Sequence, residues 1–248
     1  HIKIYKHRTI SNQHLGMSPN KKDYVEVIYN EKDRPFTTYP DQLTRYLTDR
    51  FAIQAGSSLL DVGCGRGEFL RGFIRCGATG YGVDRSSAAS KICPEADLRY
   101  ADIENDGIPF EDNYFDVVFS KSVIEHFYYP EKLIEEIYRV LKPGGMIITM
   151  CPAWEFNYRM YFEDYTHRTP FMLSSLRDIH LIHGFHDVNC EYFRQLPLLW
   201  RFPWLLPIAE LVRVLAPSFL RNHSKFIRFS KEIMLLSSVN KPEDSDSG

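Results

Sequence analysis

The chain has 248 residues, of which 44% are hydrophobic and 25% are charged, and its formal net charge at pH 7 is −2. These values are typical of a globular protein with one domain, and the length leaves room for an elaboration of that domain. A nucleic-acid partner requires many basic side chains to neutralise phosphates, and the sequence has no long basic run. Composition therefore predicts a protein that does not bind nucleic acid.

The cysteines and the start of the chain indicate where the protein works. Five cysteines, at positions 64, 76, 93, 151 and 190, form no C-x-x-C pair. An odd, scattered set is typical of free thiols in a reducing compartment. The sequence shows no signal peptide, and its first residue, His1, suggests a tag remnant or a truncated start. We therefore expect a cytoplasmic protein.

The first 40 residues predict an arm or lid that precedes the folded domain. They are mostly polar and follow no clear period. Tyr29, Phe36 and Tyr39 are candidate lid aromatics, with core packing as the alternative role of each. From residue 41 to 52, the apolar spacing predicts an amphipathic helix with which the domain begins.

A short apolar strand that ends in an acid and opens into three glycines is the most informative stretch. The strand covers residues 58–62, and Gly63, Gly65 and Gly67 follow at alternate positions. Glycines between a strand and a helix N-terminus let backbone amides approach a ligand, so the stretch predicts a cofactor cradle. A dinucleotide fingerprint would need its third glycine at position 68, where this sequence has Glu68.

Strands and helices alternate along the core of the sequence. Strands are predicted over 58–62, 79–83, 98–101, 115–120 and 145–150, and helices over 67–76, 86–92 and 131–141. This alternation predicts an α/β fold in which a parallel sheet has helices on both faces. Ligands of such sheets bind outside the carboxyl ends of the strands, where the strand order reverses.

The spacing D-x-G-x-G-x-G, from Asp61 to Gly67, resembles motif I of the class I S-adenosylmethionine-dependent methyltransferases. Further matches to that family follow in order, within about residues 40–150. They are Tyr81–Asp84, Tyr100–Ile103, Phe115–Ser120 and Leu141–Gly145. The resemblance implies a Rossmann-like fold with a seven-stranded, mostly parallel sheet and an antiparallel edge hairpin. It also implies S-adenosyl-L-methionine as cofactor and S-adenosyl-L-homocysteine as product.

The same resemblance implies how the cofactor is held. Asp84 takes the ribose hydroxyls, because a carboxylate about 20 residues past the glycines has that role in such folds. Asp102 accepts from the adenine amino group, although an acid at a strand end can also be a helix N-cap or turn residue. The cofactor-binding residues that the resemblance implies are Asp61, Gly63, Gly65, Gly67, Asp84, Arg85, Asp102, Ile103 and Ser120.

The C-terminal part of the chain contains an insertion. An aromatic loop over 155–170 and a helix over 171–183 are predicted to precede two strands, over 186–193 and 231–239. In the family these strands form a hairpin, so the residues at about 194–230 are inserted between them. We expect the methyltransferase domain to cover residues 41–240 and the last eight residues to be a disordered tail.

The insertion is both apolar and basic. Between residues 192 and 231 there are seven basic residues and one acid, which leaves a net charge of −8 on the rest of the chain. Its prolines and charges exclude a membrane-spanning helix of about 20 apolar residues. Two interpretations stay open. One is a substrate cap with solvated charges, and the other is a surface that contacts the inner face of an anionic membrane or a phosphorylated, lipid-linked substrate.

Two groups of histidines are candidates for chemistry. His180, His183 and His186 have the spacing H-x-x-H-x-x-H, but the glycine at 184 is predicted to end the helix between them, so we expect no metal site there. His167 and His126 follow predicted elements on the ligand side of the sheet. They are the candidate catalytic bases, with a binding or core role as the alternative for each.

The predicted function is methyl transfer, and oxygen is the acceptor atom that we expect. A sulfonium methyl is already activated, so an amine acceptor needs little more than alignment, whereas a hydroxyl must lose a proton. The loop over 164–171 and the basic aromatic tail are similar to methyltransferases of bacterial polysaccharide and sugar biosynthesis, which implies a sugar, glycan or lipid-linked glycan acceptor. The alternatives are a small metabolite such as a quinone precursor or an amine, and a cofactor-binding scaffold without catalysis.

Overall fold

A single mixed sheet organises the protein. The computed structural model describes residues 32 and 35–243, and the seven strands of its sheet are in the order β3-β2-β1-β4-β5-β7-β6. They are β1 (Ser58–Val62), β2 (Thr79–Asp84), β3 (Asp97–Tyr100), β4 (Phe115–Lys121), β5 (Leu141–Pro152), β6 (His186–Arg194) and β7 (Ile233–Asn240). β1 to β5 pair in parallel, and β7 runs antiparallel to both of its neighbours. The expected fold class is confirmed.

The helices occupy the connections between the strands. The α-helices are α2 (Tyr39–Arg50), α3 (Glu68–Arg75), α4 (Ile103–Asp106), α5 (Pro130–Val140), α6 (Trp154–Asn157), α7 (Leu173–Ile182), α8 (Pro197–Arg201), α9 (Leu206–Leu215) and α10 (Lys225–Lys231). The 3-10 turns are η1 (Ala88–Lys91), η2 (Ile124–His126), η3 (Tyr161–Glu163), η4 (Pro203–Leu205) and η5 (Ser218–Asn222).

The helix expected over 86–92 is wrong, because the chain forms only the turn η1 there. Ser86 Oγ accepts a hydrogen bond from the backbone N–H of Ala88, a local bond that competes with helix formation. Pro94, which has no backbone N–H, then prevents the turn from continuing. The connection between β2 and β3, residues 85–96, therefore contains a 3-10 turn in place of the expected helix.

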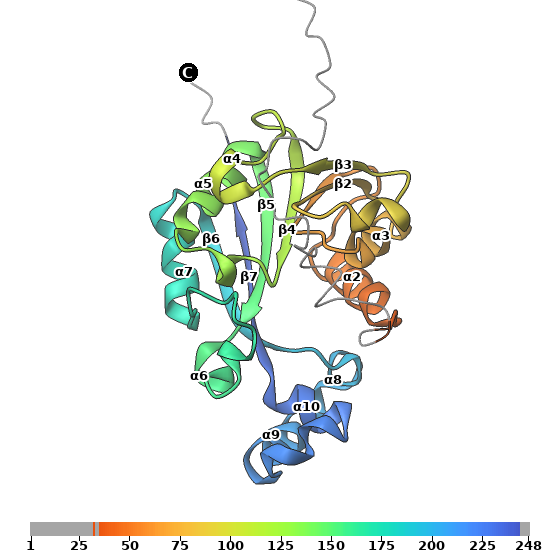
Figure 1. The fold of residues 1–248 in the computed structure, drawn as a ribbon, viewed down its shortest axis with the longest axis vertical. Coiled ribbons are helices and arrows are strands. Elements are labelled where there is room, and N and C mark those ends of the chain that lie inside the picture. Colours follow the sequence, from red (N-terminus) through yellow and green to blue (C-terminus); the bar gives the residue numbers. More distant parts are fainter. Residues whose placement is uncertain (1–31, 33–34, 244–248) are drawn as a thin grey trace, which may run out of the picture.

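The core has two layers, one on each face of the sheet (Figure 1). α5 and α7 cover one face, where Leu133, Ile137 and Leu176 are buried. α2 and α3 cover the other face, where Leu43 and Phe73 are buried. Since burying each such side chain contributes about 1.5–3 kcal/mol, these two layers fix the sheet between them.

The strand order reverses between β1 and β4. β1 pairs with β2 on one side and with β4 on the other, so the connections after β1 and β4 leave in opposite directions. Val62 is in register with Ser120, and both residues are at the carboxyl ends of their strands. This is the point at which open α/β sheets bind ligands.

The chain between β6 and β7 forms a lobe that projects from the domain (Figure 1). This insert lobe, residues 195–232, contains α8, η4, α9, η5 and α10, and its small core includes Leu199 and Ala209. Pro152, the last residue of β5, is in register with Met234, near the first residue of β7. The insert lobe therefore lies at the end of the sheet where the carboxyl ends of the parallel strands are found. None of the helices formed by residues 35–243 is long and apolar enough to cross a membrane.

Candidate functional site

The turn after β1 has a backbone that glycine adopts readily. Gly63, Gly65 and Gly67 all have positive φ angles, of +71°, +54° and +82°. A Cβ on Gly63 would come within 2.4 Å of Val123 Cγ2, so the turn packs closely on the loop that follows β4. A Cβ on Gly65 would meet no atom within 4 Å. The turn is therefore closed against the protein at its start and open where a ligand would approach.

Asp84, at the end of β2, braces this turn. Its Oδ2 accepts a hydrogen bond from the backbone N–H of Gly65 at 2.8 Å, and its Oδ1 accepts one from Ser86 at 2.8 Å. Each carboxylate oxygen has two lone pairs, so the same oxygens can also accept from a pair of hydroxyls. The geometry is suited to a ribose at the open side of the turn.

Asp61 is a buried acid at the centre of the site. Its side chain is 3% exposed, and Oδ2 has no hydrogen-bond partner among the described residues. Burial and the nearby Asp84 carboxylate raise the pKa of Asp61 well above its ordinary value, while Lys121 acts in the opposite direction. The hydroxyl of Ser120, at the adjacent strand end, is also buried without a partner. Unsatisfied acceptors of this kind fit a ligand that brings donors or positive charge.

Asp102 lies past the end of β3 and is held by two neighbours. Arg85 forms an ion pair with it, and Asn105 Nδ2 donates a hydrogen bond to it at 2.9 Å. Partial burial raises the pKa of Asp102, but these hydrogen bonds outweigh that effect and lower it. The Ile103 side chain packs into the core cluster, which leaves its backbone for any contact with a ligand.

Two loops meet beside the glycine turn. The backbone N–H groups of Arg168 and Thr169 donate to the carbonyl of Glu125 at 2.7 and 3.1 Å. Thr169 Oγ1 donates to the carbonyl of Phe127 at 2.8 Å, and Tyr161 OH donates to the carbonyl of Thr169 at 2.7 Å. The bonds to Glu125 and Phe127 hold together residues about 40 positions apart, and the Tyr161 bond ties the loop to η3.

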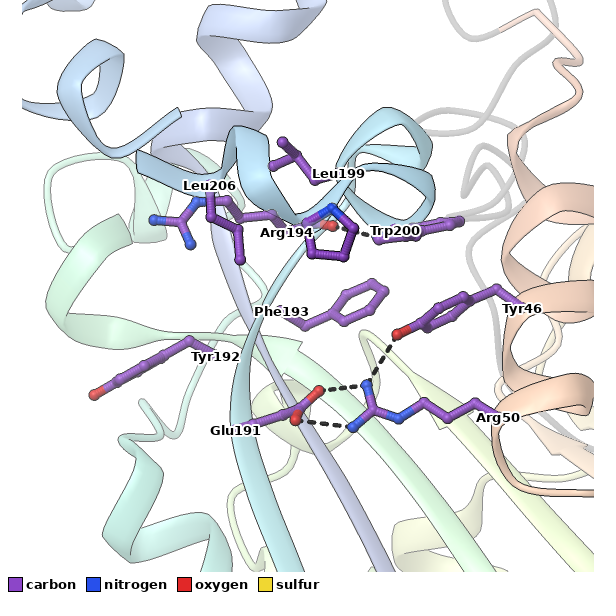
Figure 2. A pocket seen from close by; sticks show the side chains of 10 residues that line it. Tyr46, Arg50, Glu191, Tyr192, Phe193, Arg194, Leu199, Trp200 and Leu206 are labelled. Atoms are coloured by element: carbon purple, nitrogen blue, oxygen red, sulfur yellow. Dashed lines mark hydrogen bonds and ion pairs between the residues drawn. The ribbon is translucent and has the colours of Figure 1, made fainter. Parts of the chain in front are cut away.

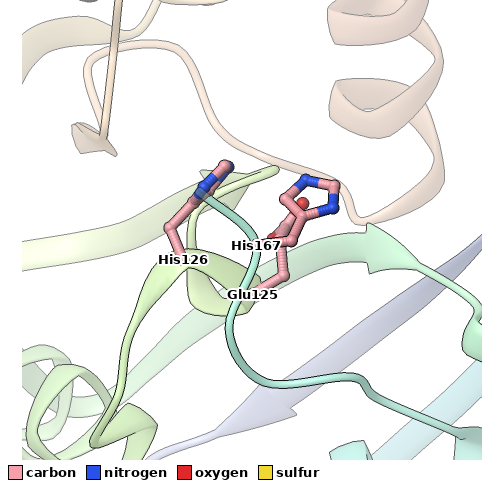
Figure 3. A group of neighbouring side chains, drawn as sticks. All are labelled: Glu125, His126 and His167. Atoms are coloured by element: carbon pink, nitrogen blue, oxygen red, sulfur yellow. The ribbon is translucent and has the colours of Figure 1, made fainter. Parts of the chain in front are cut away.

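The two predicted catalytic histidines face each other across this junction (Figure 3). The ring centroids of His126 and His167 are 4.8 Å apart. Burial lowers both pKa values, that of His126 to about 4, with His167 as a further cause. Both imidazoles are therefore neutral at neutral pH, the form that can accept a proton or bind a metal.

Hydrogen bonds fix the tautomer of each ring. His167 Nδ1 is 2.6 Å from the carbonyl oxygen of Tyr161, which is an acceptor, so Nδ1 carries the proton. His126 Nδ1 is 2.9 Å from Thr166 Oγ1, whose own hydrogen is donated to Asp164 at 2.5 Å. Nδ1 of His126 is then also the protonated nitrogen, and Nε2 carries the lone pair in both rings.

Glu125 is a functional candidate that sequence reasoning missed. It lies between the two histidines and β5, its side chain is 1% exposed, and neither carboxylate oxygen has a hydrogen-bond partner among the described residues. Burial raises its pKa to about 8, while the nearby backbone N–H groups of Glu125 and Val123 and the charge of Lys121 act in the opposite direction. The signal in the sequence was an acid directly before His126, after a strand end, but nothing in the spacing shows that its side chain is buried.

His180, His183 and His186 do not converge on one point. His180 is buried, with Nδ1 at 2.6 Å from the carbonyl of Leu176, whereas His183 Nδ1 is 3.7 Å from Glu135 Oε1. His186 contacts its neighbour Asp187.

The three candidate lid aromatics have different surroundings. Tyr29 lies outside the described residues, while Phe36 lies under the Arg66 guanidinium and Tyr39 packs on Phe69.

A separate groove lies between α2 and the insert lobe (Figure 2). Trp200 stacks on Tyr46 with ring centroids 4.8 Å apart, and Arg50 forms an ion pair with Glu191 at 2.6 Å. None of the predicted site residues lines this groove. The Trp200–Tyr46 stack attaches the insert lobe to α2, and the Arg50–Glu191 ion pair attaches β6 to the same helix.

Comparison with known proteins identifies a domain within this chain. Residues 60–149 match the family model described as "Methyltransferase domain". This chain contains a class I S-adenosylmethionine-dependent methyltransferase domain. The matched range includes Asp61, the glycine turn, Asp84 and Glu125, but it ends before the loop that carries His167.

Relatives of the methyltransferase domain share part of their length with this chain. Phosphoethanolamine N-methyltransferase 2 of Caenorhabditis elegans is 35% identical over 151 residues, which are 56% of this chain and 35% of that protein. The chain therefore spans about a third of that relative.

Solved structures share the fold of the methyltransferase domain. A putative methyltransferase of Haloferax volcanii, in complex with the Trm112 methyltransferase activator, has a TM-score of 0.64 and 20% identity, covering 90% of this chain and 96% of its own. Phosphoethanolamine N-methyltransferase 2 of Haemonchus contortus, with phosphomonomethylethanolamine and S-adenosylhomocysteine, has a TM-score of 0.60 and 22% identity, covering 81% and 52%.

The residues of the methyltransferase domain fit the cofactor that its family uses. The open side of Gly65, the two oxygens of Asp84 and the unsatisfied buried carboxylate of Asp61 all lie at the edge where β1 and β2 end. They offer a surface without side chains, acceptors for a diol, and a buried carboxyl whose charged form a nearby cation would favour. These are the features that a nucleoside carrying a positively charged sulfonium requires.

Proposed function

We propose that the chain is an S-adenosylmethionine-dependent methyltransferase that transfers the methyl group to a hydroxyl of a sugar, glycan or lipid-linked glycan. The observation that carries this proposal is the pair of neutral imidazoles beside the glycine turn. An amine acceptor attacks a sulfonium methyl with its own lone pair, whereas a hydroxyl requires a group that takes its proton. An enzyme that methylates a hydroxyl is therefore expected to have proton-accepting groups in addition to its cofactor-binding residues, and the two imidazoles are such groups.

The cofactor half of the site holds S-adenosyl-L-methionine, which supplies a methyl group already activated on sulfur. Asp84 accepts from the ribose hydroxyls, and the backbone of Gly63 and Gly65 lies against the nucleoside. Asp61 opposes the positive charge of the sulfonium. Arg85, Asp102, Ile103 and Ser120 complete the set, with Asp102 toward the adenine.

The acceptor half aligns the hydroxyl and activates it. His167 and His126 are the groups that accept its proton, and the bonds of their Nδ1 atoms keep both rings in the tautomer that does so. The insert lobe leaves from the same edge of the sheet and caps the acceptor. Excluding water from this edge keeps the nucleophile in line with the C–S bond.

A methyl-transfer screen tests the proposal. The full chain is incubated with methyl-labelled S-adenosyl-L-methionine and, in parallel, with sugar nucleotides, lipid-linked glycans, quinone precursors and phosphorylated amines. Label in an acid-stable methyl ether of a glycan supports the proposal, and label confined to an amine overturns it. The Asp84→Ala variant is the control, because it removes the predicted ribose acceptor. A chain that binds the cofactor and methylates no acceptor would instead be a binding scaffold.

Phosphorylated amines are the second candidate acceptors. The names of the matching C. elegans and H. contortus proteins both specify a phosphoethanolamine N-methyltransferase. An ethanolamine phosphate needs cationic side chains at the acceptor half, and Lys121 and Arg168 act electrostatically on that half. The phosphorylated-amine arm of the same screen decides between the two acceptors.

We also propose that the insert lobe contacts the inner face of an anionic membrane, so that the protein is cytoplasmic and peripheral to it. Large apolar side chains of the lobe are exposed, including Trp204 at 71%, Leu215 at 69% and Phe219 at 71%. The segment that carries them is basic, whereas the rest of the chain is acidic. Apolar anchors with a basic background are suited to a lipid-linked acceptor at a charged surface.

A further inference from the structure

We propose that Glu125, His126 and His167 form a binding site for a first-row divalent cation of the Zn²⁺ type. One ligand atom from each residue lies within 4.8 Å of the others, and the three side chains converge in Figure 3. Two imidazole nitrogens and one carboxylate oxygen are a ligand set that Zn²⁺ uses when a fourth position is left for water or substrate. No member of the set comes from the H-x-x-H-x-x-H segment.

The unsatisfied carboxylate is the first independent observation. A side chain that is 1% exposed and has no hydrogen-bond partner among the described residues costs free energy in the folded state unless something else binds it. Glu125 is pulled into this position because two backbone N–H groups from the opposite loop bind its carbonyl. A cation bound to the carboxylate removes that cost.

The orientation of the rings is the second observation. Metal-binding histidines usually donate their other N–H to a carbonyl or carboxylate, which fixes the ring and makes it a better ligand. His167 donates to the carbonyl of Tyr161, and His126 donates to Thr166, which in turn donates to Asp164. Both rings therefore present the lone pair of Nε2 as a ligand.

The charges around the cluster act in both directions. The positive charges of Lys121, near Glu125, and of Arg168, near both imidazoles, repel a cation at this site. The negative charge of Asp164 interacts with all three residues and attracts a cation to the site. A tetrahedral Zn²⁺ at about 2.0–2.1 Å from each nitrogen would place the ligand atoms roughly 3.3 Å apart, so binding requires small side-chain rotations that bring them together.

The role of the cation rests on the proposed function. A hydroxyl acceptor takes the fourth position, and the cation lowers its pKa so that the O–H bond breaks and the proton passes to solvent. The oxygen then forms the bond to the methyl carbon, and the electron pair of the C–S bond stays on sulfur. In this metal-bound form His126 and His167 are ligands, so the cation replaces their direct acceptance of the hydroxyl proton described under the proposed function, and a water molecule accepts that proton instead.

Metal binding is tested without cofactor or acceptor. The full chain is stripped with a chelator and titrated with Co²⁺, whose visible absorption reports tetrahedral nitrogen and oxygen ligands, and then with Zn²⁺ in competition. We expect one equivalent of Co²⁺ or Zn²⁺ to bind per chain. Mg²⁺ should not bind, because it prefers six oxygen ligands. Glu125→Gln and His167→Ala should each weaken Zn²⁺ binding by more than about 100-fold, beyond the 10–100-fold range of outer-ligand losses.

Two further variants separate this site from other causes. Thr166→Val keeps the shape of the loop but removes the acceptor of His126, and it should weaken Zn²⁺ binding by about 10–100-fold. His186→Ala removes an exposed histidine on β6 and should leave binding unchanged. Unaltered binding in both Glu125→Gln and His167→Ala, or no stoichiometric Co²⁺ binding, overturns the site. Zn²⁺ binding without methyl transfer would retain the metal site and reject the proposed function. Methyl transfer without Zn²⁺ binding would retain the proposed function and reject the metal site.

Discussion

The two halves of the site are built in different ways. The cofactor half consists of one continuous turn and one carboxylate that braces it, so its shape follows from the backbone of residues 61–67. The acceptor half joins η2 to a loop about 40 residues later, and its shape depends on side chains that are held by hydrogen bonds across the two. A cofactor shared by many enzymes needs only the first kind of site. The second kind can change its residues without altering the fold.

Loss of His167 is expected to have the largest effect. His167→Ala removes one of the two imidazoles that activate a hydroxyl, and it should lower kcat by about 10²–10⁴. Affinity for S-adenosylhomocysteine should change little, because the residue belongs to the acceptor half. Steady-state kinetics with the acceptor found in the screen measures the effect. If kcat stays within a few-fold of the wild-type value, the acceptor half does not work through this residue.

His180 tests whether a buried imidazole outside the site affects only stability. Its pKa is lowered to about 4 by burial, whereas the unfolded chain binds the proton near pH 6.5. Between these values the unfolded state binds more protons, so stability decreases as the pH falls from about 6.5 to 4. The free energy of unfolding should fall by up to about 3 kcal/mol over that range, since one pKa unit corresponds to about 1.36 kcal/mol.

Denaturant unfolding at several pH values measures this dependence, with His183→Gln as the control for a partly exposed histidine. His180→Gln should reduce the slope, while His183→Gln should retain it. Equal slopes in wild type and His180→Gln would show that another group causes the acid sensitivity.

Two glycines with the same backbone freedom provide a matched test of the cofactor half. Gly65 and Gly56 both have positive φ angles, and a Cβ on either would meet no atom within 4 Å. Gly65→Val and Gly56→Val should each cost about 1–2 kcal/mol of stability, because a branched side chain is strained in the left-handed region. Only Gly65→Val should also lower affinity for S-adenosylhomocysteine, by about tenfold or more. Equal affinities in the two variants would place the ligand elsewhere.

The smallest effects are expected from the insert lobe. Trp204→Ser and Phe219→Ser should reduce co-sedimentation with anionic vesicles, and neutral vesicles should bind less of the wild-type protein. Lys225→Glu should weaken binding by about 1 kcal/mol at low salt, an effect that salt screens. Arg221 and Arg228 are less informative, because they already form ion pairs with Glu163 and Glu232. Wild-type protein that ignores anionic vesicles at low ionic strength would leave the lobe as a substrate cap.

Local sequence predicted the strand and the glycine turn of the cofactor half because that geometry is local. An apolar strand, an acid and three glycines specify a turn within a few residues, and the family spacing then places Asp84 beside it. The same reasoning succeeded for α2, whose apolar spacing is regular, and for β7, which begins with a continuous apolar run. It failed at residues 86–92, where a serine side chain closes a local turn and no helix follows.

The acceptor half could be predicted only in part. His126 and His167 stood out because each follows a strand or loop on the ligand side. Glu125 did not, because its importance comes from burial without a partner, which depends on the packing of η2 against β5 and the opposite loop. The insert lobe was recognised from composition, but which of its apolar side chains pack, as Leu199 does, and which are exposed, as Trp204 is, depends on tertiary contacts.

The central claim is that the two halves are separate, and one calorimetric comparison tests it most directly. Wild type, Asp84→Ala and His167→Ala are each titrated with S-adenosylhomocysteine under the same conditions. Asp84→Ala should lose about 1.5–3 kcal/mol of binding free energy, the range for hydrogen bonds to a charged group, and His167→Ala should match wild type. Wild-type affinity in a folded Asp84→Ala protein, together with lost affinity in His167→Ala, would contradict the account.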